Sequence, residues 1–150
     1  VFALMKLAEK YGIGKIYIHA FLDGRDTGPN SASDFLQEAE ERIKQIDNCR
    51  IASVIGRFYA MDRNKNWDRI QLAYGLITQG VSEYQCKNSI EAIELAYDRG
   101  EGDEFVMPTA IVDENGQTVS IEEGDAIIFA NYRNSQLFFQ NLINLFSIGF

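Results

Sequence analysis

Apolar residues along the chain follow two patterns, short continuous runs and longer stretches in which they recur every three or four positions. The continuous runs cover residues 15–22, 50–56 and 125–132 and predict buried strands. The periodic stretches cover residues 1–12, 31–47, 67–80 and 89–100, and they predict amphipathic helices, with a further helix from about Gln136. Because strands and helices alternate, we expect an α/β fold with a layered, mostly parallel but mixed sheet flanked by helices.

Polar residues and glycines at the element ends support this division. Ser31 with Asp34 three residues later predicts a capped helix start, with Phe35 among the residues facing inward. Asn88 is a candidate cap for a second helix, and Gly80 and Gly100 follow helix ends. The pair 115–116, Asn-Gly, predicts a hairpin turn between extended segments.

Composition places the chain among ordinary globular domains of about one domain's length. It has 150 residues, of which 46% are hydrophobic, and a formal net charge of −8. This acidic balance argues against nucleic acid or an anionic membrane as the main partner, although several arginines in one place could still bind a small anion. No apolar run reaches the 18 residues of a membrane span. Both ends interrupt apolar helical patterns, so we expect the chain to be a fragment of a larger protein.

Histidine and cysteine usage narrows the chemistry further. The chain has a single histidine, His19, inside a predicted strand, which argues against a histidine-based metal site or a catalytic triad within it. Cys49 and Cys86 have no metal-type spacing and are expected to be reduced thiols, which favours a cytoplasmic protein.

Arginines stand just beyond the predicted strands. Arg25, Arg57 and Arg133 each follow an apolar run, and Arg63 lies six residues after Arg57. Ligands of open α/β sheets bind outside the carboxyl ends of strands, and the planar guanidinium suits carboxylate and phosphate. The four arginines therefore predict a site for a small, multiply anionic molecule, and Gly24 with Gly56 would permit tight turns and close approach of the backbone to that ligand.

A structural alternative stays open at this point. The arginines could instead pin loops by pairing with Asp23, Asp26 and Asp62 in water. Two roles are also open for Asp26, which could pair with Arg25 or could orient and deprotonate a substrate hydroxyl.

Four segments of the chain resemble the cofactor-independent (2,3-bisphosphoglycerate-independent) phosphoglycerate mutases. They read YIHAFLDGRDTGP, IGRFYAMDRNKNWDRIQLAY, EFVMPTAIV and DAIIFANYR, in the family's order and approximate spacing. The resemblance implies that residues 1–150 are part of the substrate-binding, or phosphotransferase, domain of a two-domain enzyme. It implies a glycolytic isomerase that interconverts 3-phosphoglycerate and 2-phosphoglycerate through a phosphoserine. We expect a monomeric full-length enzyme.

Motif by motif, the resemblance also implies residue roles. Arg25, Arg57, Arg63 and Arg133 match substrate-binding positions, and Asp26 matches both a substrate contact and the carboxylate that handles the glycerate hydroxyl proton. The serine and the ligands of two manganese ions would lie in an alkaline-phosphatase-like domain outside this chain, so no metal ligand is expected here and the fragment alone should be inactive.

One position departs from the family pattern. Gln136 stands where a further arginine is expected, so a charge-assisted contact would be lost. This departure supports an alternative function, a non-catalytic or degenerate module that binds an anionic metabolite.

Overall fold

The computed structural model describes residues 1–130, so Arg133, Gln136 and the helix expected from Gln136 lie outside the described residues. The helices within this range are α1 (Phe2–Lys10), α2 (Ala32–Ile43), α3 (Arg57–Ala60), α4 (Trp67–Gln79) and α5 (Ser89–Asp98), with one 3₁₀ turn, η1 (Asp103–Phe105). The strands are β1 (Ile16–Leu22), β2 (Cys49–Gly56), β3 (Tyr84–Cys86) and β4 (Thr109–Ile111). The predicted α/β class is confirmed.

The strands form one mixed sheet in the order β1-β2-β4-β3. β1 pairs parallel to β2, and β3 pairs parallel to β4, whereas β4 runs antiparallel to β2. The register places Leu22 opposite Gly56, so β1 and β2 end level with each other. Val54 faces Thr109, so β4 begins at the edge where β1 and β2 end.

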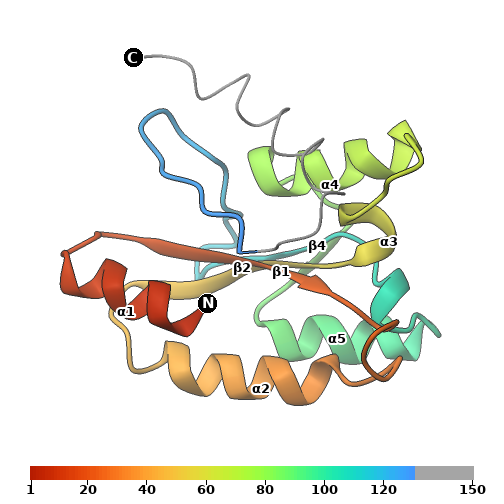
Figure 1. Ribbon diagram of the computed structural model, residues 1–150, viewed down its shortest axis with the longest axis horizontal. Coiled ribbons are helices and arrows are strands. Elements are labelled where there is room, and N and C mark those ends of the chain that lie inside the picture. Colours follow the sequence, from red (N-terminus) through yellow and green to blue (C-terminus); the bar gives the residue numbers. More distant parts are fainter. Residues whose placement is uncertain (131–150) are drawn as a thin grey trace.

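Helices cover both faces of the sheet (Figure 1). One face carries α1, α2 and α5, and its core includes Met5, Leu36 and Ile93. The other face carries α3 and α4, and its core is built around Ile55 and Leu76. Each face buries apolar side chains, which is the driving force expected for a layered α/β domain.

Several predicted element ends are confirmed. The Asn88 side chain accepts a hydrogen bond from the Glu91 backbone N–H at 2.8 Å and so caps α5. Gly80 ends α4 in the left-handed conformation with φ of 67°. A turn forms at 115–116, with Asp113 accepting backbone N–H groups from Asn115 and Gln117, but residues 117–120 form no strand and so no β-hairpin with β4.

The start of α2 differs from the prediction. Asp103, 72 residues away in sequence from Ser31, accepts the backbone N–H groups of Ser31 and Ala32, each at 2.9 Å. The Tyr97 hydroxyl donates to the other oxygen of Asp103, which is 1% exposed. Asp34 is exposed in the first turn, and Phe35, expected inside, is also exposed. A distant buried carboxylate thus takes the capping role assigned to local residues.

Two strand assignments also change. Residues 125–130, the described part of the predicted strand 125–132, form no strand, and Ile128 is exposed. An apolar run becomes a strand only where a neighbouring strand supplies ladder hydrogen bonds, and the described sheet supplies none to this run. β3 carries no strong apolar pattern in the sequence, and its three residues form a strand by pairing with β4.

His19 and the cysteines lie in the fold as expected. His19 Nδ1 lies 2.7 Å from the Ser53 hydroxyl, and burial lowers its pKa to about 4, so the ring is neutral near pH 7. Cys49 and Cys86 are both free thiols, and burial raises the pKa of each. Among residues 1–130, no helix is long and apolar enough to cross a membrane.

Candidate functional site

Three chain segments meet at the edge where β1 and β2 end. Arg25 lies in the loop after β1, and Arg57 follows β2 directly as the first residue of α3. The antiparallel direction of β4 brings η1, which precedes it, to the same edge, and the Gly56 backbone N–H donates to the Val106 carbonyl at 2.9 Å. The predicted placement of arginines at strand ends is therefore confirmed for β1 and β2.

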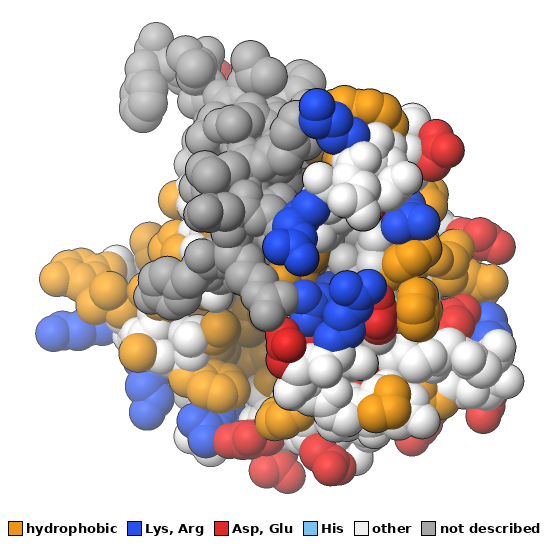
Figure 2. Space-filling model, turned by 45° about the vertical axis from the view of Figure 1, so that its right-hand side comes forward, with side chains coloured by type: hydrophobic (Ala, Val, Ile, Leu, Met, Phe, Trp, Pro, Cys, Tyr) orange, Lys and Arg blue, Asp and Glu red, His pale blue; other side chains and the backbone are white. Residues whose placement is uncertain are grey.

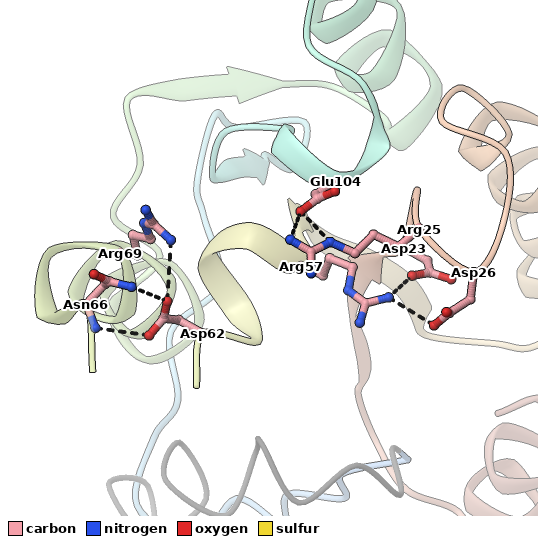
Figure 3. A network of polar contacts seen from close by, with 8 residues as sticks. All are labelled: Asp23, Arg25, Asp26, Arg57, Asp62, Asn66, Arg69 and Glu104. Carbon is pink, nitrogen blue, oxygen red and sulfur yellow. Dashed lines mark hydrogen bonds and ion pairs between the residues drawn. The ribbon is translucent and has the colours of Figure 1, made fainter. Parts of the chain in front are cut away.

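Arg57 is held by two aspartates from the loop after β1 (Figure 3). Its Nη1 pairs with Asp23, and the same nitrogen lies 3.1 Å from Oδ2 of Asp26. The Arg57 side chain is only 9% exposed, whereas that of Asp26 is 62% exposed. This arrangement ties the two strand-end loops together, as the structural alternative had suggested, but Arg57 is buried rather than solvated.

The pKa of Asp23 is lowered, and its pairing with Arg57 is a main reason. Burial acts to raise the pKa of Asp23, but the hydrogen bond from Arg57, backbone N–H donors and the charge of Arg57 outweigh it. The pKa of Asp23 is therefore held below its usual range, and its carboxylate stays ionised near neutral pH.

Arg25 pairs with Glu104 of η1, a partner that the sequence did not reveal. Arg25 Nε donates to Oε1 of Glu104 at 2.6 Å, and Nη2 contacts the same oxygen. The Arg25 side chain is 56% exposed and that of Glu104 is 12% exposed. The hydrogen bond and charge of Glu104 raise the pKa of Arg25 above its ordinary value.

The two glycines that precede these arginines let η1 approach closely. A Cβ on Gly24 would lie 2.6 Å from the Glu104 backbone nitrogen, and one on Gly56 would lie 2.6 Å from the Glu104 carbonyl carbon. Gly24 also has φ of 68°, which other residues rarely adopt. The prediction placed a ligand beside these glycines, whereas the structure places the backbone of η1 there.

Arg63 lies on the loop between α3 and α4, which Asp62 organises. Asp62 accepts the backbone N–H groups of Asn64 and Asn66, and its second oxygen pairs with Arg69 at 3.4 Å. Burial would raise the pKa of Asp62, but the hydrogen bonds from Asn66 and Asn64 and the charge of Arg69 keep it low. Asp62 thus pairs with Arg69 rather than with Arg63, which is exposed and forms no ion pair within residues 1–130.

A cation–π contact and a tilted pair of aromatic rings connect Arg69 to η1. The Arg69 guanidinium lies 3.7 Å from the centre of the Phe58 ring, and the Phe58 and Phe105 ring centres are 5.1 Å apart. In Figure 3 the group Asp62–Asn66–Arg69 lies on the other side of α3 from Arg25 and Arg57. The structure therefore brings Arg25, Arg57 and Asp26 together, and it links the Arg63 loop to them indirectly.

Charge at this edge is mixed rather than purely positive. Figure 2 shows Lys and Arg side chains gathered near the middle of one face with acidic side chains beside them. By formal charge, the carboxylates of Asp23, Asp26 and Glu104 balance Arg25, Arg57 and Arg63. Arg133, the fourth arginine of the predicted site, lies outside the described residues.

Metal-ligating residues do not gather here. In the part of the chain that the structure describes, no group of three or more His, Cys, Asp or Glu side chains could hold a metal ion. The charged groups at this edge are guanidinium groups, which suit anions rather than metal ions, and carboxylates that pair with them.

A family model and curated relatives match most of the chain. A model described as the BPG-independent PGAM N-terminus matches residues 1–142. The chain is 51% identical over 131 residues to the 2,3-bisphosphoglycerate-independent phosphoglycerate mutase of Shewanella amazonensis, covering 87% of this chain and 26% of the relative. The corresponding protein of Saccharophagus degradans is also 51% identical, with 87% and 25% covered.

A solved structure shares the fold. A crystal structure of Leishmania mexicana phosphoglycerate mutase, determined at low cobalt concentration, superposes with a TM-score of 0.76 at 28% identity. The match covers 83% of this chain and 24% of that one. The chain therefore spans about a quarter of the length of the proteins it matches.

Proposed function

The chain belongs to the family of the BPG-independent phosphoglycerate mutase N-terminus, and from this membership we propose that it is part of a phosphoglycerate mutase. In this proposal residues 1–150 form part of the substrate-binding domain of an isomerase that interconverts 3-phosphoglycerate and 2-phosphoglycerate. The observation that carries the proposal is the meeting of Arg25, Arg57 and Asp26 at one edge of the sheet in a chain of this family.

The arginines would clamp the glycerate. Arg25 is the most accessible guanidinium of the paired arginines at this edge, and its contacts through Nε and Nη2 leave other N–H donors for a carboxylate or phosphate. Arg63 is exposed on the neighbouring loop, and Arg133 would add charge that the described residues lack. Arg57 would act at the base of the site, where it orients Asp26.

Asp26 would serve as the proton acceptor for a glycerate hydroxyl. Its carboxylate is exposed to a ligand and is fixed by Arg57 at 3.1 Å. A positioned carboxylate can take a proton from a hydroxyl within hydrogen-bond reach during phosphoryl transfer. Holding the glycerate through the reaction would keep the enzyme from releasing it and acting as a phosphatase.

The remaining parts of the reaction would lie outside this chain. The phosphoryl group would pass through a serine, and two manganese ions would be held by an alkaline-phosphatase-like domain that this chain does not include. A manganese ion would supply charge stabilisation for the transferred phosphoryl group. We further propose that the full-length enzyme is a cytoplasmic monomer that acts in glycolysis on this small-molecule substrate.

Mutase assays of the full-length protein test this proposal. With manganese, the wild type should convert 3-phosphoglycerate to 2-phosphoglycerate, and Asp26→Asn should lower kcat about 10²- to 10⁴-fold, the usual contribution of an acid–base group. Asp34→Asn, which changes an exposed carboxylate on α2, is the matched control and should retain activity. Absence of interconversion by the wild type, or full activity of Asp26→Asn, would contradict the proposal.

A second candidate function is a module that binds an anionic metabolite without catalysis. Gln136, where the family resemblance implies an arginine, favours it. Gln136→Arg should then tighten binding of 3-phosphoglycerate about tenfold or more, the gain from one charge-assisted contact, without producing turnover. Unchanged affinity, or turnover by the wild type, would leave the mutase as the better account.

A further inference from the structure

We propose that Glu104 is a positioning residue for substrate binding, because its carboxylate holds the Arg25 guanidinium in the orientation in which the anion meets it. This inference rests on the function proposed above. It concerns a residue in η1, outside the two strand-end loops from which the site was predicted.

The two members of the pair differ sharply in their surroundings. Arg25 is more than half exposed, so its long side chain would sample many rotamers if nothing held it. Glu104 is 12% exposed, and one of its oxygens accepts from both Nε and Nη2 of Arg25. An ion pair with so exposed a partner contributes little to folding stability, so its main consequence is the orientation of Arg25.

Glu104 is itself fixed through its backbone and its neighbours. Its main chain packs against both Gly24 and Gly56, where no side chain could fit. Asp103 is anchored to the start of α2, and Phe105 packs on Phe58. The turn that carries Glu104 therefore has a fixed position relative to the ends of both parallel strands.

These contacts hold Glu104 in a fixed position, where its carboxylate can orient the long side chain of Arg25. Because Arg25 is already paired with Glu104, its side chain loses less conformational entropy on substrate binding than an unpaired arginine would. The remaining N–H donors of Arg25 stay available for the ligand. Glu104 thus acts through Arg25 and does not itself need to touch the substrate.

Steady-state kinetics of the full-length enzyme test the proposal. Glu104→Gln keeps the shape of the side chain but removes its charge. KM for 3-phosphoglycerate should then rise about two- to tenfold, because substrate binding must immobilise one more flexible side chain. The value of kcat should change less than about twofold. The matched control is Glu38→Gln, because Glu38 also pairs with an arginine, Arg42, but both residues lie on α2. Its KM should stay at the wild-type value.

A double-mutant cycle separates positioning from a purely structural role. Calorimetric titration with 3-phosphoglycerate should show that Glu104→Gln weakens binding in the wild type and has no further effect in Arg25→Ala. Equal weakening in both backgrounds, or wild-type KM in Glu104→Gln, would overturn the proposal. If Glu104→Gln does not fold, Glu104→Asp, which withdraws the charge by one methylene, carries the same expectations.

Failure of the proposed function would look different. A wild-type enzyme without mutase activity, or an Arg25→Ala variant with unchanged affinity, would overturn the substrate site itself and this inference with it. If the wild type is active and Arg25→Ala weakens binding, but Glu104→Gln has no effect, only the role of Glu104 is overturned.

Discussion

Arg25 and Arg57 follow neighbouring parallel strands that end level with each other, yet the fold treats them differently. Arg57 is almost fully buried and bridges Asp23 and Asp26, whereas Arg25 is largely exposed and has one acidic partner, Glu104. Both pairs join segments that are distant in sequence. The buried pair fixes the geometry of the loops, and the exposed pair presents a guanidinium to solvent.

This difference shows that a guanidinium at a strand end need not be mainly a ligand group. Leaving a buried carboxylate or arginine without its partner costs much more than breaking an exposed pair. We therefore expect loss of Arg57 to damage stability and binding together, and loss of Arg25 to damage binding alone.

The largest expected effect is that of Arg57→Ala. Arg57→Ala deletes a buried side chain and removes the cation that Asp23 and Asp26 share, so unfolding free energy should fall by about 2–4 kcal/mol. Urea unfolding of the full-length protein measures the loss, with Arg57→Lys as a control that keeps the charge and should lose less. A loss below about 1 kcal/mol would show that the pair is only a surface contact.

Asp103→Ala should have the next largest effect. It removes the distant cap of α2 and leaves the Tyr97 hydroxyl without its acceptor, which should cost about 2–3 kcal/mol in unfolding free energy. Asp34→Ala, in the first turn of the same helix, is the control and should cost about 0.3–1 kcal/mol through the helix dipole. Equal losses for the two variants would contradict the assignment of the cap to Asp103.

A smaller effect should appear as pH dependence at Asp23. Because its pKa is lowered in the folded state from an ordinary value of 3.8, its contribution to stability is present above about pH 5 and is lost as pH falls through the folded pKa. The stability difference between wild type and Asp23→Asn should therefore shrink below about pH 4 in urea titrations. In an Arg57→Ala background this pH dependence should largely disappear, and its persistence there would assign the shift to another group.

The sequence was sufficient to place Arg25 and Arg57 and to suggest Asp23 and Asp26, the two partners of Arg57, but it did not reveal Glu104 as the partner of Arg25. The apolar runs located β1 and β2, and Arg25 and Arg57 lie at the edge where both strands end. Glu104 and Asp103 were missed because they reach this edge only through the antiparallel direction of β4, a strand of three residues with no pattern that reveals its orientation. Asp103 and Glu104 follow Gly102 shortly after a helix, and nothing in this local sequence indicates that both acidic side chains are largely buried.

Local signals were reliable where the energetics are local. Asn88 caps α5 and Gly80 ends α4 as predicted, because each forms contacts within a few residues. Asp62 was expected to pair with an arginine of the predicted site and does pair with an arginine, but the partner is Arg69 on α4. Its carboxylate also accepts backbone N–H groups of the turn that follows it, from Asn64 and Asn66. Residues 125–130 were misassigned because strand formation depends on a partner that sequence alone does not supply.

The most direct test of the account is a titration of 3-phosphoglycerate into full-length Arg25→Ala, paired with its urea unfolding curve. Because Arg25 is exposed, its loss should change unfolding free energy by no more than about 1 kcal/mol. The same change should weaken binding about tenfold or more, the value of one charge-assisted contact to a substrate anion. Wild-type affinity in this variant would contradict the proposal that this edge of the sheet binds the substrate.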